Sequence, residues 1–123
     1  MVFAGSVSQA ELCTYYRLAS AYLCLSEHEG FCVPLLEAMH FGVPVIAYAA
    51  AGVPGTMGEA GLLVHDKDFP AIAELAHRVV RDPALRAAVT AGQRARLRAF
   101  DAETIGATLR GHLETLTSAE ALR

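Results

Sequence analysis

The stretch that decides the fold is residues 26–39, which read SEHEGFCVPLLEAM. An apolar run at 21–25 precedes it, and a helix-like pattern continues from Pro34 to about Phe41. Proline suits the first turn of a helix, because its φ is already helical and its missing N–H would be unpaired there. Gly42 can end the helix in a left-handed conformation. The stretch therefore predicts a strand, a loop and then a helix.

The start of this expected helix favours the binding of an anion. The backbone N–H groups from Cys32 to Leu36 have no acceptor in the preceding turn, and the positive end of the helix dipole lies among them. Glu29 on the loop and Glu37 in the helix flank this position. Because a carboxylate repels a phosphate, we interpret both glutamates as acceptors for hydroxyl groups. A sugar nucleotide, which carries a diphosphate between hydroxylated sugars, fits this arrangement.

Strand-like and helix-like segments alternate along the rest of the chain. We expect strands at 2–5, 21–25, 44–48 and 61–64, helices at about 9–19, 34–41, 69–81, 83–98 and 101–117, and a glycine-rich loop at 50–59. Alternation of this kind favours a parallel sheet with right-handed crossovers. The sequence thus predicts an α/β fold, a Rossmann-like parallel sheet of about four short strands with helices on both faces and a helical C-terminal tail. We divide the single domain into an α/β part, 1–66, and the tail, 67–123.

Composition narrows the class of protein. A chain of 123 residues with 54% hydrophobic residues can bury one core, and a net charge of −3 argues against a nucleic-acid partner. The longest apolar run, 43–51, is too short for a transmembrane segment, so we expect a cytoplasmic protein. Arg17 is the only Lys or Arg up to Asp66, so the candidate phosphate site has no cation near it in sequence. The arginines of the 83–98 helix do not share one narrow face, and we interpret that helix as solvated.

Neither cysteine nor histidine spacing predicts a metal site. The three cysteines form no CxxC pair and His28, His40 and His65 match no ligand spacing, so we expect no metal and no disulfide framework. Cys24 reads as a small buried hydrophobic residue. Cys32 differs, since a thiol beside a helix N-terminus tends toward the thiolate.

Three motifs together resemble a known family. EGFCVPLLEAM (29–39), GVPVIA (42–47) and GVPGTMGEAGLLV (52–64) are similar to the C-terminal domain of retaining glycosyltransferases of the GT-B fold, of the family 4 or group 1 type. The resemblance extends from about Val2 to about Leu116. It implies a partial GT-B C-terminal domain that recognises a UDP- or GDP-linked sugar, for glycosyl transfer with retention and without a metal.

The resemblance also assigns roles to residues. It implies that Glu37 holds the ribose diol, that Glu29 contacts the donor sugar as the one candidate catalytic residue, and that Gly30 lets the backbone approach the donor closely. Backbone N–H groups of Phe31, Cys32 and Val33 would approach the diphosphate or the sugar. The complete set of expected donor-binding residues is Ser26, Glu29, Gly30, Phe31, Cys32, Val33, Leu36 and Glu37.

The resemblance further implies that longer relatives carry an acceptor-binding domain and basic residues upstream of this part. We therefore expect the chain alone not to transfer sugar. Two alternatives stay open: a non-catalytic fragment or subunit completed by a partner chain, and a different Rossmann-type nucleotide binder, although no GxGxxG motif follows the first expected strand. Either strand 2–5 pairs with strand 21–25, or an apolar sheet edge stays open and favours a homodimer or a complementing chain.

Overall fold

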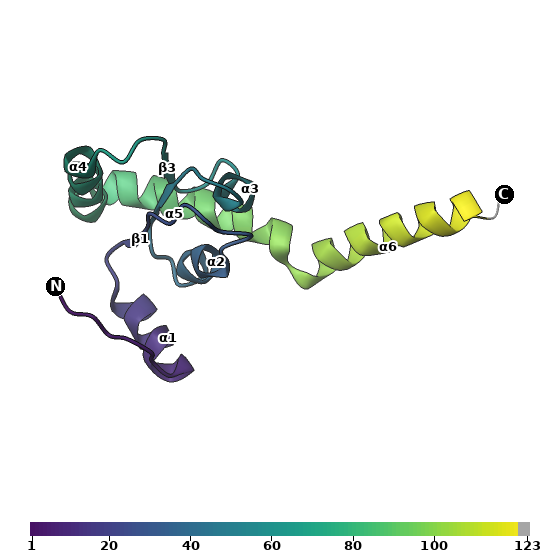
Figure 1. The fold of residues 1–123 in the computed structure, drawn as a ribbon, viewed down its shortest axis with the longest axis horizontal. Helices are drawn as coiled ribbons and strands as arrows, with labels where there is room; N and C mark the ends of the chain where they lie inside the picture. Colours follow the sequence, from purple (N-terminus) through teal and green to yellow (C-terminus); the bar gives the residue numbers. More distant parts are fainter. Residues whose placement is uncertain (121–123) are drawn as a thin grey trace.

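The computed structural model describes residues 1–120 and consists of a parallel sheet with helices packed around it (Figure 1). Strands β1 (Tyr22–Cys24), β2 (Val45–Tyr48) and β3 (Leu62–Val64) form the sheet in the order β1-β2-β3, and both pairs are parallel. The helices are α1 (Gln9–Leu18), α2 (Val33–His40), α3 (Val53–Met57), α4 (Phe69–Arg81), α5 (Pro83–Leu97), the 3-10 turn η1 (Arg98–Phe100) and α6 (Ala102–Glu120). The predicted α/β class with a parallel sheet is confirmed.

Helix α2 begins and ends as the sequence predicts. Pro34 lies in its first turn, and Gly42 follows its last turn with a φ of +69°. The N–H of Gly42 donates to the carbonyl of Met39 at 3.0 Å, and the N–H of Val43 donates to that of Ala38 at 2.9 Å. These bonds satisfy carbonyls that the end of the helix would leave unpaired. The chain then turns directly into β2.

The central strand is covered on both faces. Successive side chains of a strand point to opposite faces, and Val45, Ile46 and Ala47 are all fully buried. Val45 and Ala47 belong to the main core cluster with Leu35 and Met39 of α2, whereas Ile46 points to the other face. A strand buried on both faces has no polar alternation, which is the pattern that the sequence shows.

Helix α5 is attached to the start of β2 by one buried side chain. The amide nitrogen of Gln93 donates to the carbonyl of Val43, and its amide oxygen accepts from the N–H of Val45, both at 2.8 Å. Gln93 is fully buried, so these bonds satisfy two backbone groups that no other strand pairs. Helix α5 also packs against α2 and α4, which fixes α2 between α5 and the sheet.

Two local predictions were wrong. Residues 2–5 form no strand: Val2 and Phe3 are almost fully exposed and Gly5 has a φ of +65°. A strand exists only through bonds to a neighbouring strand, and within residues 1–120 this run pairs with none. Among the described residues only β2 pairs with β1, so the sheet has three strands and an open edge where Leu23 is 49% exposed. The predicted loop 50–59 contains the short helix α3.

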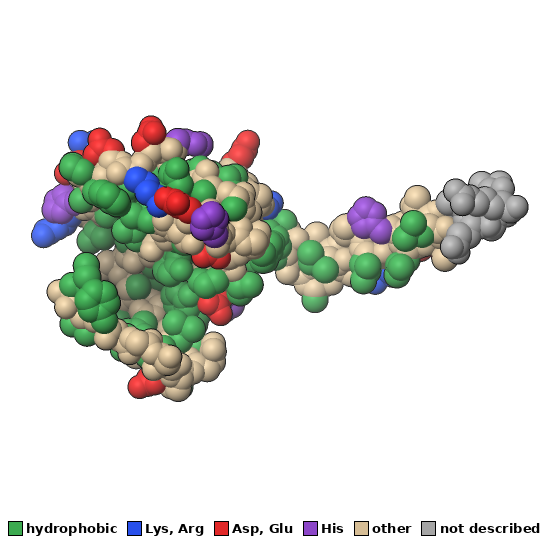
Figure 2. All heavy atoms as spheres, in the orientation of Figure 1, with side chains coloured by type: hydrophobic (Ala, Val, Ile, Leu, Met, Phe, Trp, Pro, Cys, Tyr) green, Lys and Arg blue, Asp and Glu red, His purple; other side chains and the backbone are tan. Residues whose placement is uncertain are grey.

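Apolar side chains remain exposed at two places outside the sheet. Figure 2 shows hydrophobic side chains lining the recess between the N-terminal segment with α1 and the rest of the molecule. Helix α6 projects from the body, and its apolar stripe is about half exposed, at Ile105, Leu109, Leu113 and Leu116. No helix within residues 1–120 is long and apolar enough to cross a membrane. The last three residues of the predicted tail, 121–123, lie outside the described part.

Candidate donor-binding site

The loops that follow the three strands meet at the carboxyl edge of the sheet, where ligands of parallel α/β sheets bind. The N–H of Gly52, after β2, donates to the carbonyl of Glu29, after β1, at 2.8 Å. The ammonium of Lys67, after β3, donates to the carboxylate of Glu27 at 2.6 Å and lies 4.8 Å from the ring centroid of Tyr48. Lys67 is thus a cation at this edge, which its position in the sequence does not reveal.

Gly52 is the residue that allows the loops to approach so closely. A Cβ built on Gly52 would lie 1.7 Å from the carbonyl oxygen of Gly30 and 2.9 Å from that of Glu29. Such contacts are far inside van der Waals distance, so only glycine fits here. Gly30, by contrast, has open space around its Cα. The glycine required by packing inside the protein is therefore Gly52, which the sequence analysis did not single out.

Helix α3 holds the next residues of the loop between β1 and α2 (25–32), which we call the donor loop after the function that its sequence predicts. The hydroxyl of Thr56 donates to the carbonyl of Phe31, and the ring of Phe31 packs edge-on against that of Phe100, with centroids 5.5 Å apart. Arg96 of α5 donates from Nε to the carbonyl of Thr56 at 3.0 Å and from its terminal nitrogen to that of Gly55 at 2.6 Å. A chain of contacts therefore runs from α5 through α3 to the donor loop.

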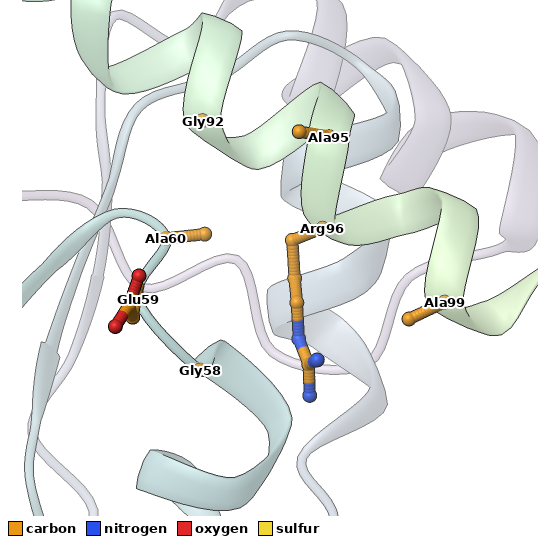
Figure 3. A pocket seen from close by; sticks show the side chains of 7 residues that line it. All are labelled: Gly58, Glu59, Ala60, Gly92, Ala95, Arg96 and Ala99. Carbon is orange, nitrogen blue, oxygen red and sulfur yellow. The ribbon is translucent and has the colours of Figure 1, made fainter.

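Arg96 is an exception to the interpretation of α5 as a solvated helix, whose Arg94 is exposed. Its guanidinium lies 4.7 Å from the ring centroid of Phe100 and against the Cα of Gly58. Figure 3 shows the side chain extending from α5 toward the turn at Gly58, along the wall of a hollow of about 530 Å³ that Glu59 and Ala60 also line. The sequence could not show this, because the carbonyls that Arg96 binds lie 40 residues or more away along the chain.

The N-terminus of α2 carries no side-chain cap. Cys32 is the N-cap residue, with φ 59° and ψ 63°, and its carbonyl accepts from the N–H of Leu35 at 3.0 Å. Within residues 1–120, the N–H groups of Phe31 and Cys32 donate to no acceptor of the protein. These are donors of the kind that an anion at a helix N-terminus uses. Val33, at the first position of the helix, is 54% exposed.

Glu37 is oriented by a tyrosine from another helix. The hydroxyl of Tyr16 in α1 donates to Oε2 of Glu37 at 3.0 Å, whereas Oε1 has no protein partner among the described residues. Burial and then the bond to Glu37 raise the pKa of Tyr16 well above its ordinary value. Glu37 and Leu36 border a second hollow, of about 370 Å³, between α2 and the end of α5. Tyr16 showed no signal of this role, since helical spacing marks it only as a core residue.

The two buried cysteines lie side by side beneath the loop. The sulfurs of Cys24 and Cys32 are 3.9 Å apart, and both residues are less than a tenth exposed. The expected tendency of Cys32 toward the thiolate is wrong, because burial and then the neighbouring Cys24 raise the pKa of its thiol. Burial also raises the pKa of the nearby Tyr22 to about 12, and Cys24, Cys32, Glu29 and Glu37 add to this shift in smaller amounts.

The structure brings most of the predicted site residues to one end of the sheet. Glu29 is half-buried in the loop, Gly30 and Phe31 are exposed, and Cys32 turns its thiol into the core. Ser26 is half-buried just after β1. Sequence reasoning missed the residues that position this loop, which are Gly52, Thr56, Lys67 and Arg96, and the one that orients Glu37 in α2, which is Tyr16. All of them act through contacts between segments far apart in the chain.

Comparison with known proteins supports one family. Residues 1–97 match the family described as glycosyl transferases group 1. The O-antigen chain mannosyltransferase B of Escherichia coli is 33% identical over 101 residues, which cover 82% of this chain and 26% of that protein. The D-inositol 3-phosphate glycosyltransferase of Frankia alni is 33% identical over 120 residues, which cover 95% of this chain and 30% of the relative.

A solved structure agrees with the sequence comparisons. Sucrose-phosphate synthase from Thermosynechococcus elongatus superposes with a TM-score of 0.73 at 33% identity, over 96% of this chain and 30% of that one. The chain thus spans less than a third of the length of these relatives. With the family match over most of its length and the shared GT-B architecture, the chain belongs to the group 1 glycosyltransferases.

Proposed function

We propose that the carboxyl edge of the sheet binds a nucleotide-sugar donor, UDP- or GDP-linked. The observation that carries the proposal is the uncapped N-terminus of α2 with a carboxylate on either side of it, Glu29 in the loop and Glu37 in the helix. Free N–H groups and the helix dipole attract the diphosphate, while the carboxylates accept bonds from hydroxyls on both sides of it. Membership of the group 1 glycosyltransferases supports this assignment.

Each glutamate takes one end of the donor. Tyr16 occupies Oε2 of Glu37 and leaves Oε1 to accept from the ribose diol. Glu29 would contact the donor sugar, and its carbonyl accepts from the N–H of Gly52, so the loop is in place before the donor arrives. A preorganised acceptor loses less free energy to ordering on binding than a mobile one does.

Transfer itself, with retention at the anomeric carbon, requires positive charge on the leaving diphosphate. Lys67 is paired with Glu27, and Arg96 is bonded to two carbonyls of α3. Both cations near the loop are thus engaged elsewhere. Since stabilisation of developing charge is usually the largest catalytic contribution, we expect the isolated chain to bind donor without transferring sugar. No metal is required for this binding role.

A second candidate function rests on the open edge of the sheet. Only β2 pairs with β1 within the described residues, and Leu23 on this edge is half exposed. An unpaired apolar edge attracts another strand. The alternative is therefore a non-catalytic role in which a second copy or a partner chain completes the sheet. Sedimentation analysis tests the second copy: a concentration-dependent dimer supports a role for the edge, and a monomer at all concentrations contradicts completion of the sheet by a second copy.

The donor-binding proposal is tested by a cycle of ligands and variants. UDP, its 2′-deoxy analogue and a UDP-hexose are titrated into wild type, Glu37→Gln and Glu29→Gln. If Glu37 holds the ribose diol, removal of the 2′-hydroxyl weakens binding to wild type by about tenfold or more, the loss of a hydrogen bond to a charged group. The same change has little effect in Glu37→Gln. The matching cycle for Glu29 compares UDP with the UDP-hexose.

Glu59→Gln is the matched control, because Glu59 is an exposed acid that lines the other hollow. It should bind all three ligands as wild type does. GDP and its analogues are titrated in parallel, because the proposal covers both uracil and guanine nucleotides. Failure of every UDP and GDP ligand to bind the folded chain would overturn the proposal.

A further inference from the structure

Three side chains with metal-binding atoms converge under the donor loop. The sulfurs of Cys24 and Cys32 and a carboxylate oxygen of Glu29 all lie within 4.8 Å of one another. We propose that they form a binding site for one thiophilic divalent cation, of which Zn²⁺ is the physiological example. The sequence predicts no metal here, because the cysteines form no CxxC pair and seven residues separate Cys24 from Cys32. The loop between β1 and α2 folds back on itself and removes that separation.

The spacing of the sulfurs fits a metal better than a disulfide. Two thiolates bound to a tetrahedral zinc at about 2.3 Å each lie about 3.8 Å apart, and the sulfurs of Cys24 and Cys32 are 3.9 Å apart. A disulfide requires a separation of about 2.0 Å. The cysteines could therefore bind zinc almost without moving, whereas oxidation would require a shift of nearly 2 Å.

The chemistry of the three ligands also suits zinc. Thiolates and carboxylates are ordinary zinc ligands, and three protein ligands leave the fourth tetrahedral position to water. On binding, each thiol releases its proton to solvent, so the metal replaces the contact between the two sulfurs. Both cysteines are held by rigid elements: Cys24 ends β1, and Cys32 is the N-cap of α2. Glu29 is half-buried and is the most exposed of the three ligands, so a cation would reach the site from its side.

A cation at this site has a consequence for donor binding that rests on the proposed function. Glu29 would be a metal ligand and could no longer accept a hydroxyl of the donor sugar. Glu37 lies outside the cluster and would still hold the ribose. Zinc should therefore abolish the affinity advantage of a UDP-hexose over UDP and leave the binding of UDP itself largely unchanged.

The metal site is tested first, without nucleotide and with a phosphine reductant present. Co²⁺ is titrated into the full chain as an optical probe, followed by Zn²⁺ to displace it. The proposal expects one equivalent of Co²⁺ with a thiolate-to-cobalt charge-transfer band, which Zn²⁺ removes. Cys24→Ser and Cys32→Ser should lose the band, and Glu29→Gln should bind about tenfold more weakly or worse. A wild-type protein with no band would overturn the proposal.

The third cysteine supplies the matched control. Cys13 lies on α1, outside the cluster, so Cys13→Ser should keep the band at full intensity. If serine at position 24 or 32 unfolds the chain, wild type alone still decides the question. In prolonged alkylation, which reaches the two buried thiols only when the chain opens, Zn²⁺ should then protect Cys24 and Cys32, read by mass spectrometry, and leave Cys13 as reactive as before. Equal protection of all three thiols, or of none, contradicts the site.

The nucleotide experiment follows with zinc present and absent. Failure of nucleotides to bind in either condition, with the cobalt band intact, would reject the proposed function and leave the metal site standing. Binding of the UDP-hexose that is unaffected by zinc would reject the competition at Glu29. If the UDP-hexose binds more tightly than UDP without zinc and loses this advantage when zinc is present, the result supports both the metal site and the proposed function.

Discussion

Gly52→Ala is the substitution for which the structure predicts the sharpest effect. The Cβ of alanine would lie 1.7 Å from the carbonyl oxygen of Gly30, where real Cβ atoms do not come closer than 3.0 Å. The donor loop and Gly52 must therefore separate by at least the difference, 1.3 Å. The neighbour is backbone rather than a flexible side chain, so the contact cannot be relieved by a change of rotamer.

Two contributions determine how much Gly52→Ala lowers the free energy of unfolding. Forcing an extra carbon into a packed position costs about 1–3 kcal/mol. Moving the loop also breaks the bond between the N–H of Gly52 and the carbonyl of Glu29, 2.8 Å long, which is worth about 1 kcal/mol. We expect Gly52→Ala to lower the free energy of unfolding by about 2–4 kcal/mol. Nucleotide binding should fall further, because Glu29 moves with the loop.

Urea unfolding monitored by circular dichroism measures the effect, as a midpoint lower by on the order of 1–2 M. Gly55→Ala is the matched control: Gly55 lies in α3, the helix that Gly52 precedes as N-cap, and a Cβ there meets nothing within 4 Å. Alanine in a helix is favoured over glycine by about 0.5–1 kcal/mol, so this control should be neutral or slightly stabilising. Equal midpoints for Gly52→Ala and Gly55→Ala would refute the reasoning.

Three further predictions each concern a single residue. Tyr16→Phe removes the hydrogen-bond donor to Glu37. The free energy of unfolding should fall by about 1–2 kcal/mol, and the affinity for UDP should fall by less than in Glu37→Gln. Unchanged stability and unchanged UDP binding by calorimetry would contradict this role. Gln93→Leu leaves the N–H of Val45 and the carbonyl of Val43 buried without partners. Thermal unfolding should show a free energy of unfolding lower by about 2–5 kcal/mol, and a decrease under 1 kcal/mol would contradict the attachment of α5 to β2. Burial raises the pKa of Tyr22 to about 12, so its contribution to stability is complete below about 10, the pKa of tyrosine in the unfolded chain, and is lost as the pH rises toward 12. The free energy of unfolding should therefore decline less steeply above pH 10 in Tyr22→Phe than in wild type. Parallel declines in the two proteins would argue against the shift.

Local patterns predicted the elements whose ends are set by nearby residues. Pro34 and Gly42 fix the two ends of α2 through their own backbone preferences, and the unbroken apolar run of β2 indicated a strand covered on both faces. The wrong predictions concern segments whose state depends on distant partners. The apolar run 2–5 resembles a strand, but nothing in the described chain pairs with it. Gly52, Pro54 and Gly55 resemble a turn, yet Pro54 occupies the first turn of α3.

The site shows the same difference between features that nearby residues determine and features that distant segments determine. Glu29, the α2 N-terminus and Glu37 follow from a strand–loop–helix pattern within one short stretch. The contacts that hold them do not, because the packing of β2, β3, α3 and α5 brings in Gly52, Thr56, Lys67 and Arg96. The pairing of Cys24 with Cys32 is of the same kind, since only the path of the loop brings the two sulfurs together.

The most direct test of the central claim is an amide-resolved NMR titration of the chain with UDP, GDP and their hexose conjugates. The account predicts a well-dispersed spectrum in which the ligand shifts the amides of residues 26–38, above all those of Phe31 and Cys32, whose N–H groups have no protein acceptor within the described residues. The hexose conjugate should add shifts around Glu29. A dispersed spectrum with no shifts at these amides for any of the ligands would contradict donor binding at the carboxyl edge of the sheet.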